Sequence, residues 1–202
     1  MIEGMQQTAH HHSPTPSGVH LHTEGFAHPR RNVAILGIEH GMKVADFGSG
    51  SGAYALAIAE WLSNSGHVYA IDIQRDLLKR TQNEATRRKL KNISVVWGDL
   101  EVYGGSKIAD RHVDLVLVSN LLFQVGERPA VIAEARRILK PTGRLVIIDW
   151  SDSFKGMGPH RDDVVTKDAA LGITREGGFD LLREFSPGAH HYGLMLRPTH
   201  IS

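Results

Sequence analysis

Short apolar runs alternate with longer segments of helical periodicity along most of this chain. The runs have the length of β-strands and lie at 43–47, 67–72, 93–97, 113–119 and 144–149. The helical segments between them lie at 53–62, 75–90 and 127–139. A loop with room for a short helix is expected at 102–110. This alternation of strand and helix predicts an α/β fold built on a parallel sheet.

The pattern changes in the last third of the chain. A helix is expected at 164–176, and two strand-like runs follow it at 179–185 and 191–197. The connection between these runs contains Ser186-Pro187-Gly188 and is too short for a crossover. We therefore expect the last two strands to form an antiparallel hairpin.

The N-terminal segment has neither a helical nor a strand period. It is polar and contains several histidines, including His10-His11-His12, which we interpret as part of a solvated stretch and not as a metal site. We expect residues 1–29 to form a flexible arm and 30–202 to form one domain, with the segment at 26–30, where the two meet, acting as a lid over the acceptor. A short helix at 31–38 would pack against an edge of the sheet.

A glycine-rich turn joins the first strand to the first long helix. It reads Gly48-Ser49-Gly50-Ser51-Gly52, and Asp46 precedes it. Glycine permits a positive φ angle and lets a ligand approach the backbone closely. The helix that follows directs unpaired N–H groups at such a ligand. A strand, a glycine turn, a helix and a second strand ending on an acid predict a nucleotide-binding unit.

Polar residues end each of the first four predicted strands. They are Asp46, Asp72, Asp99 and Asn120. The carboxyl ends of parallel strands meet at one edge of a sheet, where ligands bind at the point at which the strand order reverses. An acid at a strand end is often only a turn former. Four polar residues converging at one edge nevertheless predict a ligand site.

The spacing of these motifs resembles that of the class I methyltransferases that depend on S-adenosylmethionine (SAM). The turn reads G-x-G-x-G and not the G-x-G-x-x-G of dinucleotide-binding proteins. Asp72, Gly98-Asp99, the strand at 113–119 with Asn120, and the segment 139–145 resemble further motifs of that family, in the same order. The closest pattern is that of methyltransferase type 11, which includes the ubiquinone/menaquinone C-methyltransferases. The similarity extends over about residues 30–198.

The resemblance implies a fold and a set of cofactor contacts. The fold is a Rossmann-like three-layer sandwich with a seven-stranded, mostly parallel sheet of order 3-2-1-4-5-7-6, in which strand 7 is antiparallel. The implied cofactor is SAM, with S-adenosylhomocysteine as its product. Asp72 would hold the ribose hydroxyls, and Asp99 would accept from the adenine amine. The remaining implied contacts are Asp46, Gly48, Ser49, Gly50, Gly52, Ile73, Leu100 and Asn120.

No catalytic base follows from the sequence. Methyl transfer from a sulfonium has a neutral leaving group, so holding the acceptor in line supplies most of the catalysis. Four histidines lie on predicted loops or strand ends, and we assign none of them as a base: His28, His160, His190 and His191. Phe123 and Trp150 are equally compatible with an acceptor pocket and with core packing.

Composition narrows the function classes only slightly. The chain has 202 residues, a formal net charge of +1 and no cysteine, which excludes a disulfide scaffold and a cysteine nucleophile. No segment has the length of a membrane span and no secretory signal is visible, so we expect a cytoplasmic protein. The oligomeric state is left open.

Several activities are compatible with these motifs. The leading interpretation is an enzyme that methylates a small molecule, because no basic stripe or Asn-Pro-Pro-Tyr type tetrapeptide indicates a nucleic-acid substrate. RNA or protein is the alternative acceptor. A non-catalytic SAM-binding domain is a second class. An NAD-dependent oxidoreductase is a third, and the glycine spacing argues against it.

Overall fold

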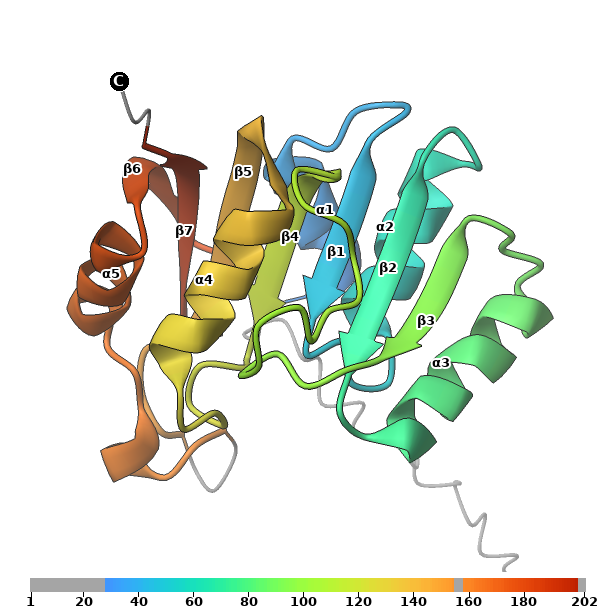
Figure 1. Cartoon of the computed structure of the whole chain (residues 1–202). Helices are drawn as coiled ribbons and strands as arrows, with labels where there is room; N and C mark the ends of the chain where they lie inside the picture. Colours follow the sequence, from blue (N-terminus) through green and yellow to red (C-terminus); the bar gives the residue numbers. More distant parts are fainter. Residues whose placement is uncertain (1–27, 155–157, 200–202) are drawn as a thin grey trace, which may run out of the picture.

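The computed structural model describes residues 28–154 and 158–199. Its elements follow one another as alternating strands and helices, and all of them are drawn in Figure 1. They are α1 (Pro29–Val33), a 3-10 turn (Ala34–Leu36), β1 (Lys43–Phe47), α2 (Ala53–Leu62), β2 (His67–Asp72), α3 (Arg75–Arg87), β3 (Ile93–Trp97), β4 (Val113–Ser119), α4 (Arg128–Ile138), β5 (Leu139–Trp150), a second 3-10 turn (Arg161–Asp163), α5 (Lys167–Glu176), β6 (Phe179–Phe185) and β7 (His191–Pro198).

One seven-stranded sheet organises the domain, with the order β3-β2-β1-β4-β5-β7-β6. The first five strands pair in parallel, whereas β7 is antiparallel to both β5 and β6. The expected strand order and the reversed last strand are therefore confirmed. The order reverses between β1 and β4, so a crevice is expected where the carboxyl ends of these two strands separate. In Figure 1 the arrowheads of the parallel strands point to the same, lower edge of the molecule.

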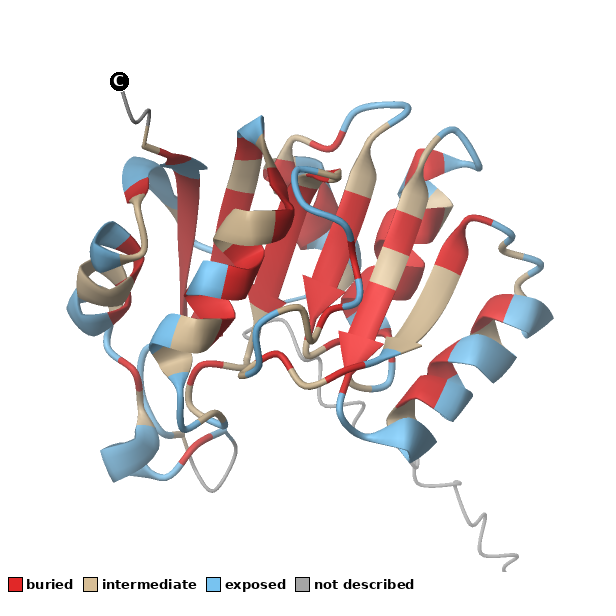
Figure 2. Ribbon diagram, viewed as in Figure 1, coloured by how far each residue is buried: buried red, intermediate tan, exposed pale blue. Residues whose placement is uncertain are grey.

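Helices cover both faces of the sheet and form the two outer layers of a three-layer sandwich. One buried cluster joins α1, α2 and α3 to one face, with Ile58 and Leu117 completely buried. The other joins α4 and α5 to the opposite face, with Phe47 and Ile132 completely buried. The central strands are buried along most of their length (Figure 2), as expected for parallel strands covered on both faces.

Most predicted bounds are confirmed, and the exceptions have local causes. The helix after β2 ends at Arg87 and not at residue 90, because Lys89 turns into the left-handed region with φ 58°. The last helix begins at Lys167 and not at 164, because the Thr166 side chain caps it by accepting from the N–H of Ala169. The first helix starts at Pro29, two residues before the expected position, where proline suits a first turn.

The strand β5 is longer than the apolar pattern predicts. It begins at Leu139 and not at residue 144, although its pairing with β4 is interrupted between Val113 and Leu115. The segment 140–144 contains no apolar run, so the sequence pattern does not indicate a strand there. Its residues are exposed or half-exposed apart from Gly143. Lys140 is held there by an ion pair with Asp114 at 2.6 Å.

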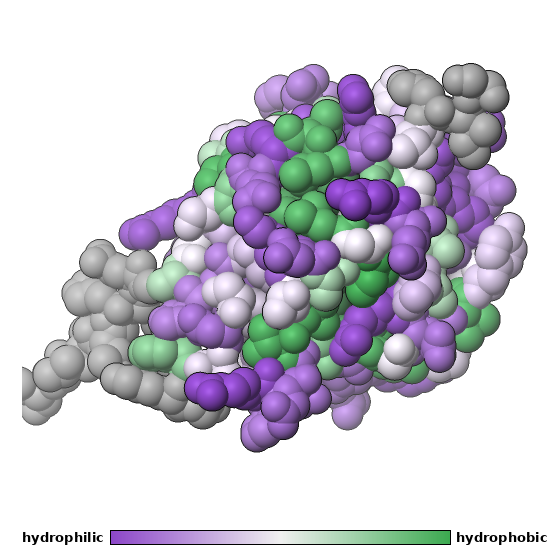
Figure 3. Space-filling model, turned by 90° about the vertical axis from the view of Figure 1, so that its left-hand side faces the viewer, coloured by the Kyte–Doolittle hydropathy of each residue, from purple (hydrophilic) through white to green (hydrophobic). Residues whose placement is uncertain are grey.

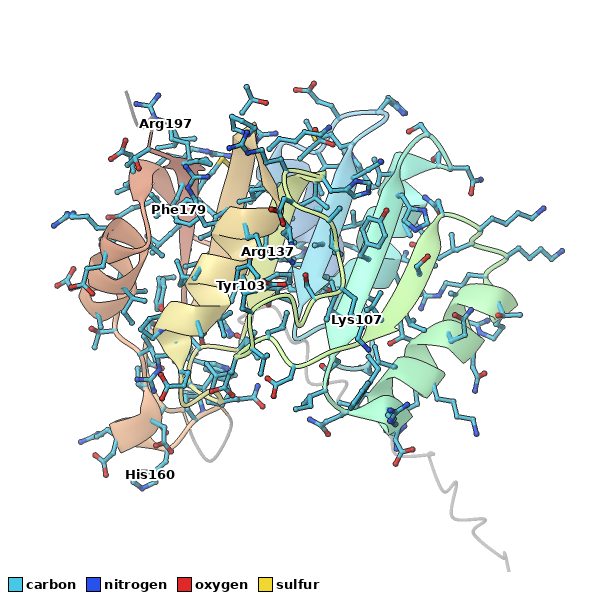
Figure 4. The ribbon with its side chains drawn as sticks, in the orientation of Figure 1. Tyr103, Lys107, Arg137, His160, Phe179 and Arg197 are labelled. Carbon is cyan, nitrogen blue, oxygen red and sulfur yellow. The ribbon has the colours of Figure 1, made fainter. Side chains whose placement is uncertain are left out.

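The connection between β3 and β4 contains no helix within its described residues, 98–112, so the short helix expected there is absent. Glu134 of α4 fixes this loop by accepting from the backbone N–H groups of Gly104 and Ser106, each at 3.0 Å. Burial alone would raise the pKa of Glu134, but hydrogen bonds from Arg137, Ser106 and Gly104 outweigh it and lower the pKa to about 2. Arg137 also lies against the ring of Tyr103 (Figure 4), so α4 holds the loop at several points.

The far edge of the sheet, at β6, carries exposed apolar side chains. Leu181 and Leu182 are exposed, and Figure 3 shows hydrophobic residues at the surface on the side formed by α5 and β6. A register shift between Leu181 and Arg183 interrupts the pairing of β6 with β7. A bulge and charged residues such as Asp180 and Arg183 protect an edge strand from pairing with other chains.

The expected arm is largely outside the described residues. The described residues exclude His10-His11-His12, and of the proposed lid at 26–30 they include His28, Pro29 and Arg30. The division at residue 29 therefore stays a prediction. No helix in the described parts of the chain is long and apolar enough to cross a membrane.

Candidate functional site

A cavity of about 260 Å³ lies at the carboxyl edge of the sheet. Its walls come from the residues that follow β1, β2, β3 and β4, so four separate strand ends converge on it. Residues from the glycine turn, from the start of α3 and from the loops after β3 and β4 line it: Gly48, Gly50, Asp72, Ile73, Gln74, Leu77, Gly98, Asp99, Leu100, Glu101, Leu121, Gln124 and Val125. This is the place at which the strand order reverses and where a ligand is expected.

The glycine turn presents bare backbone to this cavity. Gly48, Gly50 and Gly52 all have positive φ angles, which a residue with a Cβ atom rarely adopts. A Cβ atom at Gly50 would meet no atom within 4 Å, whereas one at Gly52 would lie 2.6 Å from the Thr81 side chain. Gly50 therefore faces open space suited to a ligand, and Gly52 lets α2 begin close against α3.

Asp72, the last residue of β2, lines the cavity and is buried. One carboxylate oxygen accepts from the N–H of Gly50 and the other from the N–H of Gln74, each at 2.8 Å. These two bonds fix the plane of the carboxylate and tie the glycine turn to the end of β2. Each oxygen has a second lone pair, so the group can still accept from two neighbouring hydroxyls of a ligand.

Two apolar side chains line a part of the cavity that we call the apolar slot. Ile73 is 56% exposed and Leu100 is buried, and both line the cavity. The indole N–H of Trp97 donates to the carbonyl of Ile73 at 2.9 Å and so fixes this wall from outside. Asp99 also lines the slot, with one carboxylate oxygen accepting from the N–H of Glu101.

Three buried polar atoms beside the glycine turn have no hydrogen-bond partner within the described residues. They are Oδ2 of Asp46, Oγ of Ser49 and Oδ1 of Asn120. Burial raises the pKa of Asp46 to about 7, and the charge of Asp72 adds to this effect. Unpartnered buried acceptors are costly and rare in native proteins. Their arrangement suits a ligand that brings hydrogen-bond donors or a positive charge.

The tyrosine at the start of α2 joins this polar group to the first helix. Tyr54 accepts from the side chain of Asn32 at 2.8 Å, and both residues are buried. Burial raises the pKa of Tyr54 to about 12, so its hydroxyl stays protonated, and the charge of Asp46 acts in the same direction. The packing of α1 is thereby connected to the acid that precedes the glycine turn.

The structure brings together the residues selected from the sequence, but not all of them line the cavity. Six of them do so: Gly48, Gly50, Asp72, Ile73, Asp99 and Leu100. Asp46, Ser49, Gly52 and Asn120 are not among its lining residues. Asn120 is connected to the cavity because its carbonyl accepts from the Gln124 side chain at 2.6 Å. Six lining residues were not selected from the sequence: Gln74, Leu77, Glu101, Leu121, Gln124 and Val125. Most of them follow closely after the ends of β2, β3 and β4, at the same edge of the sheet, and this position was a usable signal.

A second group of polar residues lies where β5 ends and β7 begins. Asp149 is buried and accepts from the N–H groups of Leu122 and Trp150, at 3.0 and 2.8 Å. Burial raises the pKa of Asp149 to about 6. In the next register position His191 lies opposite Trp150, with the two ring centroids 4.2 Å apart. The described residues contain no group of three or more acidic, histidine or cysteine side chains able to hold a metal ion.

Comparisons with known proteins agree with this geometry. A family model described as a methyltransferase domain matches residues 38–174. A ubiquinone/menaquinone biosynthesis C-methyltransferase from Shewanella sp. strain ANA-3 is 27% identical over 154 residues. That match covers 69% of this chain and 60% of the relative, so this chain spans less than two thirds of the length of the curated relatives it matches.

Solved structures show the same fold. A SAM-dependent methyltransferase from Aquifex aeolicus has a TM-score of 0.77 at 24% identity, covering 85% of this chain and 89% of the other. A protein described as a type 11 methyltransferase from Sulfolobus solfataricus has a TM-score of 0.64 at 27% identity, covering 83% and 89%. Both matches cover most of the described domain.

Proposed function

This chain belongs to the methyltransferase-domain family, and from that premise we propose that it transfers a methyl group from SAM to a small-molecule acceptor. The observation that carries the proposal is the cavity at the carboxyl edge, where a buried acid, a bare glycine turn and apolar side chains line one space, as a nucleoside joined to an amino acid requires. A nucleoside with a cationic tail fits the acceptor character of the unpartnered atoms.

The adenosine part would occupy the wall around Asp72. This carboxylate is already oriented by two backbone N–H groups and would accept from both ribose hydroxyls. Ile73 and Leu100 would enclose the adenine ring, and Asp99 would accept from its exocyclic amine. Burying the flat faces of the base between two apolar side chains supplies most of the affinity expected there.

The methionine part would occupy the glycine turn and the end of β4. Gly48 and Gly50 allow close approach of the carboxylate and chain of the amino acid. The ammonium group would supply donors and positive charge for the side chains of Asp46, Ser49 and Asn120. Ionised Asp46 is then paired with a cation, which offsets the cost of its burial.

When bound, SAM supplies an electrophilic methyl group with a neutral thioether as leaving group. The chain has to hold the acceptor in line with that methyl group and keep water away. Leu121, Gln124 and Val125 line the cavity directly after β4 and are placed to form one wall of the acceptor side. This chemistry needs no metal ion, because the thioether leaves as a neutral group.

A small acceptor is favoured over a macromolecule. The curated relatives are named for C-methylation in ubiquinone and menaquinone biosynthesis, which is compatible with a quinone-type or other aromatic acceptor here. The net charge of +1 supplies no overall attraction to nucleic acid. We propose that the protein acts in the cytoplasm.

Ligand-induced stabilisation tests the cofactor proposal. SAM and S-adenosylhomocysteine should both raise the melting temperature, because a ligand that binds only the native state adds RT ln(1 + [L]/Kd) to its stability. NAD should have no effect. Stabilisation by NAD without stabilisation by SAM would refute the proposal and favour an oxidoreductase. Binding of SAM without turnover across a broad panel of acceptors would instead favour a non-catalytic SAM-binding domain.

A further inference from the structure

Glu101 lines the cavity from the loop after β3, although it is not one of the cofactor contacts that the motifs imply. Its backbone N–H donates to Oδ1 of Asp99 at 3.0 Å. Its carboxylate oxygen Oε2 accepts from the backbone N–H of Glu127 at 2.6 Å. Glu101 therefore contacts the proposed adenine wall through its backbone and the start of α4 through its side chain.

The bond to Glu127 joins two walls of the cavity that come from separate parts of the sheet. One wall follows β3, and the other follows β4, which is separated from β3 by β2 and β1. Figure 1 shows the connection after β3 running along the carboxyl edge of the sheet toward α4. Within the described residues, no other hydrogen bond links the segment 98–101 to the segment 120–127. Glu101 is thus the polar tie between these walls.

The contact between Glu101 and Glu127 has the features of a strong hydrogen bond. Its acceptor is a carboxylate and its length is short, as in charge-assisted bonds. Glu127 precedes the first residue of α4, so its N–H belongs to a helix N-terminus, where partial positive charge favours an anion. A Cβ atom at Gly126 would lie 3.4 Å from the same oxygen, so the carboxylate lies close against this turn.

The segment between β4 and α4 is internally bonded, so a shift at Glu127 is passed along it. The side chain of Arg128 donates to the carbonyl of Leu122 at 2.7 Å. The side chain of Gln124 donates to the carbonyl of Asn120 at 2.6 Å. Three residues of this segment line the cavity. The position of Glu127 is therefore connected to the wall that we assign to the acceptor side.

We propose that Glu101 is a positioning residue that couples occupation of the adenine wall to the position of the acceptor-side wall. This inference rests on the proposed function. A ligand that binds Asp99 orders the loop that carries Glu101, and the carboxylate of Glu101 then orders the segment at Glu127. A ligand that has already ordered a segment lowers the entropic cost for the next ligand that needs it. An acceptor should therefore bind more tightly to the cofactor complex than to the empty protein, and this coupling is reciprocal.

Amide NMR of the full-length chain, titrated with S-adenosylhomocysteine, tests the coupling without an identified acceptor. The N–H groups of Gly50 and Gln74, which donate to Asp72, report ligand binding. The N–H of Glu127 reports the coupling, and its signal should move on saturation of the native chain. In Glu101→Ala the Gly50 and Gln74 signals should still move, whereas the Glu127 response should fall to less than about a third of its native size.

A conservative variant and a control distinguish positioning from general stabilisation. Glu101→Gln keeps an acceptor oxygen without the charge, so its Glu127 response should lie between those of the native chain and Glu101→Ala. A residue that only stabilised the fold would reduce the responses of Gly50, Gln74 and Glu127 alike. Glu39→Ala, at an exposed position before β1, is the matched control and should leave all three responses unchanged.

The outcomes separate this inference from the proposed function. If Gly50 and Gln74 do not respond to S-adenosylhomocysteine, the cofactor does not bind here and the proposed function is wrong. If they respond but Glu127 does not, or if Glu127 responds equally in the native chain and in Glu101→Ala, Glu101 does not couple the two walls. If Glu101→Ala does not fold, Glu101→Gln decides the question, because an undiminished Glu127 response in that variant overturns the inference.

Discussion

Replacing Asp46 by asparagine should make the unliganded protein more stable while weakening its hold on SAM. The structure buries this carboxyl group and leaves Oδ2 without a hydrogen-bond partner in the part of the chain that is described. Burial raises its pKa from 3.8 to about 7, with the Asp72 charge acting in the same direction. Ionised Asp46 therefore destabilises the empty protein, and the neutral amide of asparagine removes that penalty.

The size and the pH window of the effect follow from linkage. Between its unfolded pKa of 3.8 and its folded pKa of about 7, Asp46 binds more protons in the folded state than in the unfolded state. Its contribution to stability therefore falls as the pH rises through this window, by about 1.4 kcal/mol per pH unit, and stays constant above it. From about pH 5 to about pH 7, the Asp46→Asn variant should gain about 3 kcal/mol relative to the native chain.

Urea unfolding of both proteins at these two pH values measures the gain. All other titrating groups, including Asp149, are shared by the two proteins and cancel in the comparison. Asp180→Asn, on the exposed edge strand β6, is the matched control and should change stability by no more than about 0.5 kcal/mol at either pH. Calorimetry should show that Asp46→Asn weakens SAM binding by about tenfold or more, because a charged partner of the ammonium group is lost.

Two results would refute this reasoning. A stability difference between Asp46→Asn and the native chain that does not change with pH would show that the carboxyl group is ionised over the whole range. Unchanged SAM affinity would show that Asp46 does not face the ammonium group.

Three further variants test other parts of the site. Asp72→Ala should lower SAM affinity by at least about tenfold in calorimetry, because charge-assisted bonds to the ribose are worth about 1.5–3 kcal/mol each; unchanged affinity would contradict the ribose assignment. Trp97→Phe should weaken SAM binding a few-fold through the lost N–H bond to Ile73, about 1 kcal/mol, and equal affinity would show that this bond does not fix the slot. Gly52→Ala should destabilise the fold by more than about 1 kcal/mol in urea unfolding, because φ is 84° and the new Cβ atom would overlap a threonine of α3. The control Gly172→Ala, in a helix with free space, should instead stabilise it, and equal effects of both changes would contradict the packing argument.

The sheet was predictable because each strand is a short apolar run that ends at a turn. The bounds of β1, β2, β3, β4 and β6 follow from that pattern alone, and the strand order came from the resemblance of the motifs. The start of β5 was not predictable, since polar residues at 140–144 continue the strand where burial is low. The conformation of the loop at 98–112 was not predictable from its own residues. It is fixed by Glu134, which is about thirty residues away in the sequence.

The convergence of the strand-end residues on one edge of the sheet was predictable, whereas their cofactor roles stay predictions and their protonation could not be predicted. Chain topology brings Asp46, Asp72, Asp99 and Asn120 to one edge of the sheet, as their strand-end positions indicate. The sequence does not reveal that Asp72 has both oxygens engaged while Asp46 has an unpaired one. This difference depends on the backbone N–H groups of Gly50 and Gln74, which the fold brings to Asp72 and not to Asp46.

The unpartnered atoms beside the glycine turn share one chemical character. Oδ2 of Asp46, Oγ of Ser49 and Oδ1 of Asn120 all lack a partner in the described chain, and all three can accept hydrogen bonds. Each costs stability while the site is empty, since a buried acceptor without a donor loses its hydration. In the proposed function, the ammonium group of the cofactor would bring donors to all three. The features that destabilise the empty site would then be the ones that favour an amino-acid ligand.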